Sequence, residues 1–316
     1  KLSKVKGLTA FCHVLTESNT THKSVPMLMS SVSAHDFNSI YQQKSIITTF
    51  KEAGYQTAFF SNQRYNHSFI DFFGKEADTC NFIKENVKHA NYNPSDDELL
   101  ELVATELAKN APKQFIVLHT YGSHFNYRER YPSENAFFLP DFPVDAEVKY
   151  KDNLVNAYDN SIRYTDDFLA RLIGMLQEQN TDAAMLYSSD HGEDIFDDSR
   201  RLFLHASPVP SYYQIHVPFL LWMSDSYRDH YPSLWENTIS NKQKNISSSA
   251  SFFHTMLELG GVTTPYRNDS LSVVNVLFTE KPRVYLNDHN EARSLNEIGM
   301  GEEDFEMLQQ KGILYR

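Results

Sequence analysis

The strongest constraint in this sequence is the alternation of short, nearly continuous apolar runs with segments of helical periodicity. Continuous apolar runs are typical of strands that are covered on both faces of a sheet. We expect strands at residues 8–15, 55–60, 114–119, 183–188 and 217–223. Strands that alternate with helices favour an α/β fold with a mostly parallel sheet.

Helical patterns fill the stretches between these runs. The longest covers residues 154–176, where apolar side chains repeat at helical spacing along one stripe. Residues 40–53 and 249–259 show similar patterns. The motif Ser95-Asp96-Asp97-Glu98 has the spacing of a capping box and predicts that another helix begins there.

Length and composition limit the domain organisation and the class of partner. The 316 residues, of which 41% are hydrophobic, can bury a large core, and we expect residues 1–316 to form a single domain. Residues 131–148, with three prolines, are expected to form a surface loop, and the polar stretch after Lys281 a peripheral addition. The net charge of −12 argues against a nucleic-acid-binding protein, because phosphate backbones require a basic surface.

The chain contains neither a membrane-spanning pattern nor a cysteine-rich framework. Its longest dense apolar run, residues 217–223, is much shorter than the roughly 20 residues that cross a bilayer. The chain begins at Lys1 without a Met or a leader pattern, so we expect it to be a fragment of a longer protein. Cys12 and Cys80 allow one disulfide or two unpaired thiols, and both readings stay open.

Asp190 and His191 follow the apolar run 183–188, at the point where a strand is expected to end. Sites in α/β sheets form at the carboxyl ends of strands. A carboxylate and an imidazole suit Zn²⁺ or Mn²⁺, and Gly192 allows the backbone to turn sharply. Without further residues, an Asp that caps a turn beside an exposed His is the better explanation of the pair.

A polar turn that contains Thr20 and Thr21 follows the first apolar run and leads into Pro26. Proline near the first turn is a signal for the start of a helix. A threonine there lies at the positive end of the helix dipole, where a phosphate group binds well. A threonine hydroxyl is a weak nucleophile until a metal or base removes its proton. Helix capping by either threonine is the common alternative.

Four histidines lie near the expected strand ends. His124 and His205 are suited to bind a second metal or a phosphoryl oxygen. A core position is the stronger explanation for His119, and a position in the core or behind the ligands is the default for His216. A hydroxyl nucleophile, an Asp-His pair and further histidines are together the groups used in metal-assisted phosphoryl transfer.

Several motifs resemble those of bacterial phosphoethanolamine transferases, which belong to the alkaline phosphatase/sulfatase superfamily. In chain order they are Thr21-His22-Lys23-Ser24-Val25-Pro26, Gly122-Ser123-His124, Asn156-Ala157-Tyr158-Asp159-Asn160-Ser161, Ser188-Ser189-Asp190-His191-Gly192-Glu193 and Phe203-Leu204-His205, with Asn62 and Tyr285-Leu286-Asn287-Asp288 also in agreement. The resemblance covers nearly the whole chain. The Ser-Asp-His-Gly-Glu run is widespread in the superfamily, and the Thr-x-x-Ser-Val-Pro run is more particular to this branch.

The resemblance implies a fold and a set of site residues. The fold is a three-layer α/β/α sandwich with a mostly parallel central sheet. The metal is one zinc ion or two, with Mn²⁺ as an alternative. The implied residues are the nucleophile Thr21, the metal ligands Thr21, Asp190 and His191, the catalytic residues His124 and His205, and the substrate-binding residues His124, His205, Asn62 and Lys23.

The resemblance also implies an activity and a place in the cell. Phosphoethanolamine passes from phosphatidylethanolamine to a lipopolysaccharide acceptor, lipid A or a core sugar, through a covalent phosphothreonine intermediate. Family members carry N-terminal transmembrane helices and place this domain at the periplasmic face of the bacterial inner membrane. Contact with the membrane is therefore expected through a region that this chain does not contain.

One family feature is missing from the sequence. Family members have a glutamate ligand in a Gly-Glu-Ser motif on a strand upstream of the nucleophile, and Glu17 is too close to Thr21 to replace it. We expect that N-terminal truncation removed this ligand and the first strand of the sheet.

Alternative functions stay open at this point. The Cys-x-Pro-x-Arg motif of arylsulfatases does not follow Cys12, which argues against sulfate-ester cleavage. Another phosphodiesterase, hydrolase or glycerol-phosphate transferase of the same superfamily would share Thr21 and the Asp-His pair. A non-catalytic relative that binds lipid or glycan is favoured by the absent glutamate.

Overall fold

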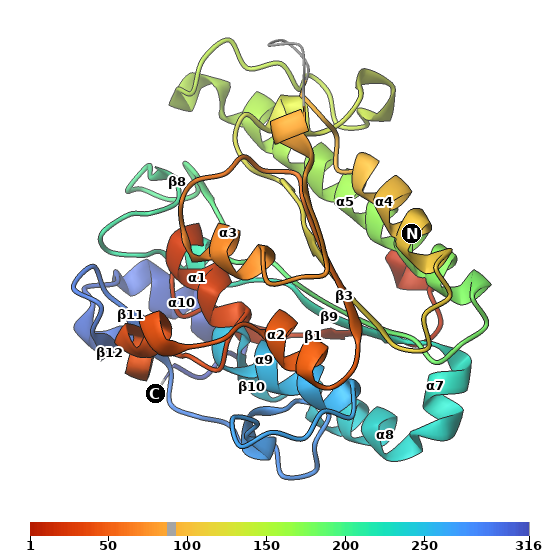
Figure 1. Cartoon of the computed structure of the whole chain (residues 1–316). Coiled ribbons are helices and arrows are strands. Elements are labelled where there is room, and N and C mark those ends of the chain that lie inside the picture. Colours follow the sequence, from red (N-terminus) through yellow and green to blue (C-terminus); the bar gives the residue numbers. More distant parts are fainter. Residues whose placement is uncertain (87–92, 316) are drawn as a thin grey trace. The chain divides into compact units, whose positions relative to one another are not determined.

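The computed structural model describes residues 1–86 and 93–315 and divides the chain into two compact units (Figure 1). The first unit comprises Lys1–Lys6, Gly54–Gln179 and Ile195–Leu204. The second unit comprises Gly7–Ala53, Asn180–Asp194 and His205–Arg316. Each unit is described by itself.

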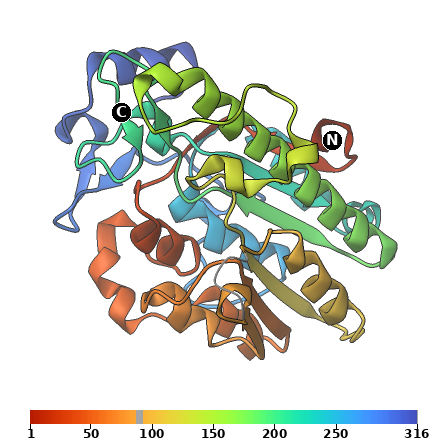
Figure 2. The same cartoon turned by 90° about the horizontal axis from the view of Figure 1, so that it is seen from above.

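The first unit is built on a three-stranded parallel sheet. Its elements are β3 (Gln56–Ser61), α3 (Phe69–Gly74), β4 (Thr79–Phe82), α4 (Glu98–Leu107), β5 (Gln114–His119) and α5 (Lys151–Glu178), the last drawn in green in Figure 2. The central strand β3 pairs in parallel with β4 and with β5. Helix α4 lies against β3 and β5. The strands predicted at 55–60 and 114–119 and the helix predicted at 154–176 are confirmed.

Local signals around these elements are partly confirmed. The Glu98 side chain accepts a hydrogen bond from the Ser95 N–H at 3.3 Å, which is half of the predicted capping box. Helix α4 has Asp97 as its N-cap, without a capping hydrogen bond from that side chain. Residues 131–148 contain 3₁₀ turns but no α-helix or strand, so the predicted loop is confirmed.

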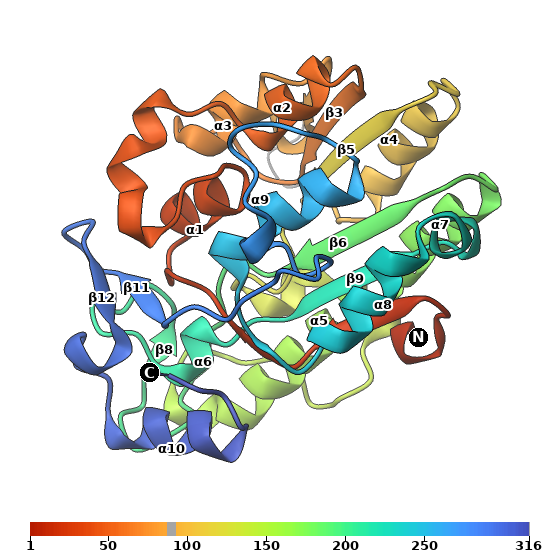
Figure 3. The same ribbon diagram turned by 90° about the horizontal axis from the view of Figure 1, so that it is seen from below.

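The second unit combines antiparallel and parallel strands. Its elements are β1 (Leu8–Phe11), β2 (His13–Leu15), α1 (Thr21–Leu28), α2 (Ile46–Glu52), β6 (Ala184–Ser188), α6 (Tyr212–Ile215), β9 (Phe219–Met223), α7 (Asp225–His230), α8 (Pro232–Asn241), β10 (Asn245–Ser247), α9 (Ser248–Leu259), β11 (Val284–Leu286), β12 (Ala292–Ser294) and α10 (Glu302–Gln310). Strand β9 lies between β1 and β6 and is antiparallel to both (Figure 3). Strand β2 pairs in parallel with β10. The two-residue strands β7 (Asp194–Ile195) and β8 (Phe203–Leu204) pair with each other, and Ile195–Leu204 belong to the first unit.

The structure confirms the α/β class and adds detail to the prediction of a mostly parallel sheet. Pairing is parallel in the three-stranded sheet of the first unit and between β2 and β10, whereas β9 is antiparallel to both β1 and β6. The single strand predicted at residues 8–15 is two strands in different sheets, separated at Cys12. A continuous apolar run does not reveal such a change of partner, because each half carries buried residues.

Two further predictions were wrong. The helix predicted at residues 40–53 is a 3₁₀ segment, Ala34–Gln42, followed by the separate helix α2. Ser45 causes the break, because its hydroxyl accepts a hydrogen bond from the Ile47 N–H at 3.1 Å and caps a new helix. The stretch after Lys281 is no peripheral addition, because Tyr285 and Leu308 belong to a buried cluster with Leu15.

Among the described residues, no helix has both the length and the apolar character that crossing a membrane requires. Cys12 and Cys80 are exposed free thiols.

His254 on α9 makes the stability of the second unit depend on pH. The side chain is buried, and its Nδ1 accepts a hydrogen bond from the Asn268 N–H at 3.1 Å. Burial lowers the pKa of His254 to about 4. The neutral imidazole therefore stabilises the fold fully above the unfolded pKa of about 6.5, and this contribution is lost as the pH falls towards 4, because only the unfolded chain then takes up the proton.

We predict that the wild type loses about 2–3 kcal/mol more of its free energy of unfolding between about pH 7 and about pH 4.5 than His254→Gln, whose side chain keeps a hydrogen-bond acceptor. The measurement is the free energy of unfolding in urea for both proteins at about pH 7 and about pH 4.5. An equal fall in stability in the variant would contradict the assignment to His254.

Candidate functional site

Thr21 and His191 lie in direct contact in the second unit. Thr21 is the first residue of α1, and His191 follows the end of β6. The Thr21 Oγ1 lies 3.0 Å from the His191 Nε2, and the His191 Nδ1 lies 3.0 Å from the carbonyl oxygen of Gly192. Because a carbonyl oxygen only accepts, Nδ1 carries the proton, and Nε2 presents a lone pair towards the threonine hydroxyl.

Asp190 completes this group. Its Oδ2 lies 3.5 Å from the His191 Nε2. The structure thus brings together Thr21, Asp190 and His191, the three residues predicted as metal ligands. A hydroxyl oxygen, a carboxylate oxygen and an imidazole nitrogen with its lone pair exposed are donors that suit zinc. The role of each residue stays a prediction.

Gly192 is required by a close approach between two segments. A Cβ at this position would lie 2.1 Å from the carbonyl oxygen of Tyr213. The Gly192 N–H also donates to the carbonyl oxygen of Gln214 at 2.8 Å. The sequence prediction explained this glycine by a sharp turn, whereas the structure explains it by space for the neighbouring backbone.

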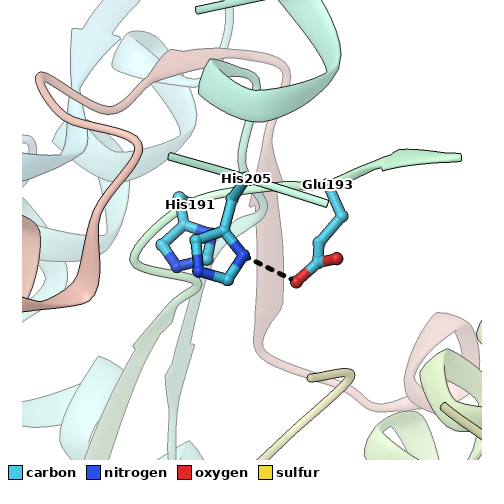
Figure 4. A group of neighbouring side chains, drawn as sticks. All are labelled: His191, Glu193 and His205. Carbon is cyan, nitrogen blue, oxygen red and sulfur yellow. Dashed lines mark hydrogen bonds and ion pairs between the residues drawn. The ribbon is translucent and has the colours of Figure 1, made fainter. Parts of the chain in front are cut away.

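Glu193 and His205 form a second group beside His191. The His205 Nδ1 lies 3.0 Å from the Glu193 Oε1, and this hydrogen bond raises the pKa of His205 against the opposing effect of burial. The rings of His191 and His205 have centroids 4.1 Å apart. One potential ligand atom from each of His191, Glu193 and His205 lies within 4.8 Å of the others, and Figure 4 shows these side chains together.

Sequence reasoning assigned no role to Glu193. A usable signal was its position two residues after His191, because alternate residues of an extended segment point to the same side. His205 was predicted as a catalytic residue, and its contact with Glu193 places it next to the Thr21–His191 pair.

Lys23 lies in the same helical turn as Thr21. Its ammonium donates to the carbonyl oxygen of Asn287, between β11 and β12, at 2.9 Å. The side chain is buried, and this burial lowers the pKa of Lys23 against the opposing charge of Asp288. The structure therefore anchors Lys23 to the C-terminal hairpin, and its predicted contact with substrate stays a prediction.

A buried amide network supports the turn before α1. The Asn19 Nδ2 donates to the Gln214 Oε1 at 2.5 Å and to the Ser207 carbonyl oxygen at 2.9 Å. The Gln214 Nε2 donates to the Asp194 Oδ2 at 2.5 Å. The Tyr285 hydroxyl donates to the Asn19 Oδ1 at 2.6 Å. Sequence reasoning missed this network, because its members come from four separate segments.

Glu17 is buried and occupied elsewhere. Its carboxylate accepts hydrogen bonds from the Ala34 N–H and the Ser247 hydroxyl, both at 2.7 Å. Burial raises the pKa of Glu17 against these bonds. This carboxylate ties three segments of the second unit together, in agreement with the prediction that it does not replace the missing glutamate ligand.

Two predicted site residues, Asn62 and His124, belong to the first unit. Asn62 is buried, and its Nδ2 donates to the Asp96 Oδ1 at 2.8 Å. Asp96 also accepts the N–H groups of Tyr121 and Gly122, at 2.8 and 2.9 Å, and so holds the loop that carries His124. The predicted roles of Asn62 and His124 in binding and catalysis stay predictions.

The other two histidines have structural partners. The His119 Nδ1 lies 3.0 Å from the Ser61 Oγ. The His216 Nδ1 lies 2.8 Å from the Tyr212 hydroxyl oxygen, and burial lowers the pKa of His216. Both observations agree with the core alternative.

We predict that Gly192→Ala destabilises the protein by about 2–3 kcal/mol, because the new methyl group displaces the backbone at Tyr213. Gly174→Ala on α5 is the matched control, since its Cβ meets no atom within 4 Å and a helical alanine stabilises by about 0.5–1 kcal/mol. Unfolding in urea measures both effects. Wild-type stability of the Gly192 variant would show that the backbone moves apart without cost.

Comparisons with known proteins now place the chain. The sulfatase family model matches residues 1–262. Phosphoethanolamine transferase EptC of Escherichia coli K12 is 25% identical over 288 residues, which cover 88% of this chain and 48% of that protein. Kdo(2)-lipid A phosphoethanolamine 7''-transferase of the same strain is 30% identical over 73% of this chain and 41% of its own length. Phosphatidylethanolamine transferase Mcr-2 of Escherichia coli is 30% identical over 72% of this chain and 44% of its own length. The chain spans about half the length of the curated relatives that it matches.

Solved structures share the fold. The C-terminal periplasmic domain of EcEptC from Escherichia coli in complex with Zn superposes with a TM-score of 0.84 at 23% identity, over 96% of this chain and 85% of that one. The soluble domain of lipooligosaccharide phosphoethanolamine transferase A from Neisseria meningitidis superposes with a TM-score of 0.78 at 22% identity, over 89% of this chain and 84% of that one. The predicted sulfatase-like α/β fold is confirmed. Because the family model covers well over half of its length, the chain belongs to the sulfatase family.

Proposed function

We propose that this chain is the catalytic part of a transferase that moves phosphoethanolamine from phosphatidylethanolamine to a lipopolysaccharide acceptor, lipid A or a core sugar. The observation that carries the proposal is the 3.0 Å contact between the Thr21 Oγ1 and the His191 Nε2, with Asp190 alongside. Relatives named phosphoethanolamine transferase and Kdo(2)-lipid A phosphoethanolamine transferase support the group transferred and the acceptor. The name of Mcr-2 supports the donor.

The proposal takes residues 1–316 as one catalytic domain at the periplasmic face of the bacterial inner membrane. Related solved structures are named as periplasmic domains and, for the Neisseria meningitidis enzyme, as an integral membrane protein. Both substrates of the proposed reaction are lipids of bacterial membranes, which agrees with that location.

In this proposal, Thr21, Asp190 and His191 hold a zinc ion. The complex of the EcEptC domain with Zn supports this metal, with Mn²⁺ as an alternative, and His205 and Glu193 are candidates for a second ion. A bound divalent cation polarises the phosphoryl group and lowers the pKa of a coordinated hydroxyl. The donor atoms on the chain suit that task, because the His191 Nε2 and the Thr21 hydroxyl already face each other.

The proposed reaction has two steps. In the first, the Thr21 hydroxyl loses its proton to solvent, a bond forms between the Thr21 Oγ1 and phosphorus, and the bond from phosphorus to the diacylglycerol oxygen breaks. With a single ion bound, His205 is suited to give that oxygen its proton, because its hydrogen bond to Glu193 favours the imidazolium form. In the second step, an acceptor hydroxyl gives its proton to His205, its oxygen bonds to phosphorus, and the Thr21 Oγ1 leaves and takes up a proton again. His124, Asn62 and Lys23 are the proposed substrate contacts.

We predict that Thr21→Ala in the full-length protein abolishes transfer, because it removes the hydroxyl oxygen that lies 3.0 Å from the His191 Nε2. Folding should change by less than about 1 kcal/mol, because Thr20 rather than Thr21 is the N-cap of α1. Thr20→Ala is the matched control and should keep activity. Release of diacylglycerol from phosphatidylethanolamine measures the first step.

Two outcomes would contradict this proposal. Activity of the Thr21→Ala variant would remove Thr21 from the mechanism. Cleavage of phosphatidylglycerol in preference to phosphatidylethanolamine would instead indicate a glycerol-phosphate transferase of the same fold.

We predict that Asp190→Asn lowers zinc affinity at least about tenfold, because an amide is a weaker ligand than a carboxylate. Elemental analysis after equilibrium dialysis against zinc measures the loss. Asp229→Asn, at an exposed position of the second unit, is the matched control. Normal zinc content in the Asp190 variant would move the metal site elsewhere.

A further inference from the structure

Apolar side chains crowd one exposed loop of the first unit. We call residues 137–144 the apolar loop, which lies in the yellow-green stretch at the top of Figure 1. Its exposed apolar residues, with exposed fractions, are Phe137 (66%), Phe138 (36%), Leu139 (67%), Phe142 (69%) and Val144 (82%). Single exposed apolar side chains are ordinary, but a dense group of them marks an interaction surface.

The backbone of the apolar loop is fixed to helix α5. The Asn160 Oδ1 accepts the N–H groups of Phe137 and Phe138, both at 2.9 Å, and its Nδ2 donates to the Phe138 carbonyl oxygen at 2.9 Å. The Asn156 Nδ2 donates to the Pro140 carbonyl oxygen at 2.9 Å. Asn160 is buried. These hydrogen bonds hold the loop in a defined conformation in which its apolar side chains are exposed.

In the apolar loop the charged residue is buried and the apolar residues are exposed. Its carboxylate, Asp141, is buried, accepts a hydrogen bond from the Tyr131 hydroxyl at 2.7 Å and pairs with Arg128 at 3.2 Å. The aromatic ring next to it, Phe142, points to solvent instead. In an ordinary surface loop the carboxylate faces water and the ring is buried.

A cation stands at the edge of this surface. The Arg163 guanidinium lies 4.0 Å from the centre of the Phe137 ring, and Arg163 is exposed on α5. Within the described part of the chain, no carboxylate forms an ion pair with Arg163. This arrangement suits the surface of a bilayer, where a guanidinium contacts lipid phosphates and phenylalanine and leucine side chains contact acyl chains.

We propose that the apolar loop inserts into the surface of a phospholipid bilayer, with Arg163 at the level of the lipid phosphates. This rests on the proposed function, in which donor and acceptor are both membrane lipids. The loop would then give the catalytic part its own contact with the membrane that contains its substrates.

The test is co-sedimentation of the 316-residue chain with vesicles of phosphatidylethanolamine and phosphatidylglycerol. We predict that the combined variant F137S/L139S/F142S binds at least about tenfold more weakly, because burial of these side chains drives insertion. Arg163→Gln should weaken binding severalfold. V276S/L277S removes side chains that are 77% and 62% exposed in the second unit and should bind as the wild type does. Circular dichroism checks that each variant is folded.

Vesicle binding requires no turnover, so it separates this proposal from the proposed function. Wild-type binding by the triple variant, or no binding by the wild type, would overturn the membrane surface even if transfer is active. A triple variant that only loses a dimer in sedimentation velocity would also overturn it, since the loop would then cover a second copy of the chain. Absence of transfer by the full-length protein, together with normal vesicle binding by the 316-residue chain, would instead contradict the proposed function alone.

Discussion

The buried side chain of Gln214 is the interaction on which the candidate site depends. Its amide oxygen accepts from Asn19, in the turn before α1, and its amide nitrogen donates to Asp194, after β6. Its carbonyl oxygen accepts the N–H of Gly192. One fully buried residue thus joins the segment that carries Thr21 to the segment that carries His191. Buried amides that lose one partner are costly, so this arrangement is strongly specified.

The closeness of Asp190 and His191 to Thr21 was predictable in part, because it depends on where a strand ends. Asp190 and His191 come directly after an apolar run, and parallel or mixed sheets present such residues at one edge. Thr21 was predictable from the helix-start signal at Pro26 together with the family motif. These signals are local, or are carried by motifs, and they remain visible in a single sequence.

The remaining features depend on contacts between distant segments. The division of residues 8–15 into β1 and β2 depends on which strands accept each half, β9 and β10, and no property of the run itself records this. The C-terminal stretch looked peripheral because it is polar on average, yet Tyr285 and Leu308 are buried. Arg283 also donates to the carbonyl oxygen of His13 at 2.7 Å, which joins this stretch to the start of the chain.

Asp141 is buried whereas its neighbours in the loop are exposed, so we expect different evolutionary constraints on them. A change at Asp141 affects Tyr131 and Arg128 and therefore alters the stability of the fold, whereas a change at Leu139 alters mainly the exposed surface. Natural variation can therefore change the hydrophobicity of the exposed positions while the fold of the loop is kept. In related chains we would look for drift at the outer positions around an unchanging aspartate.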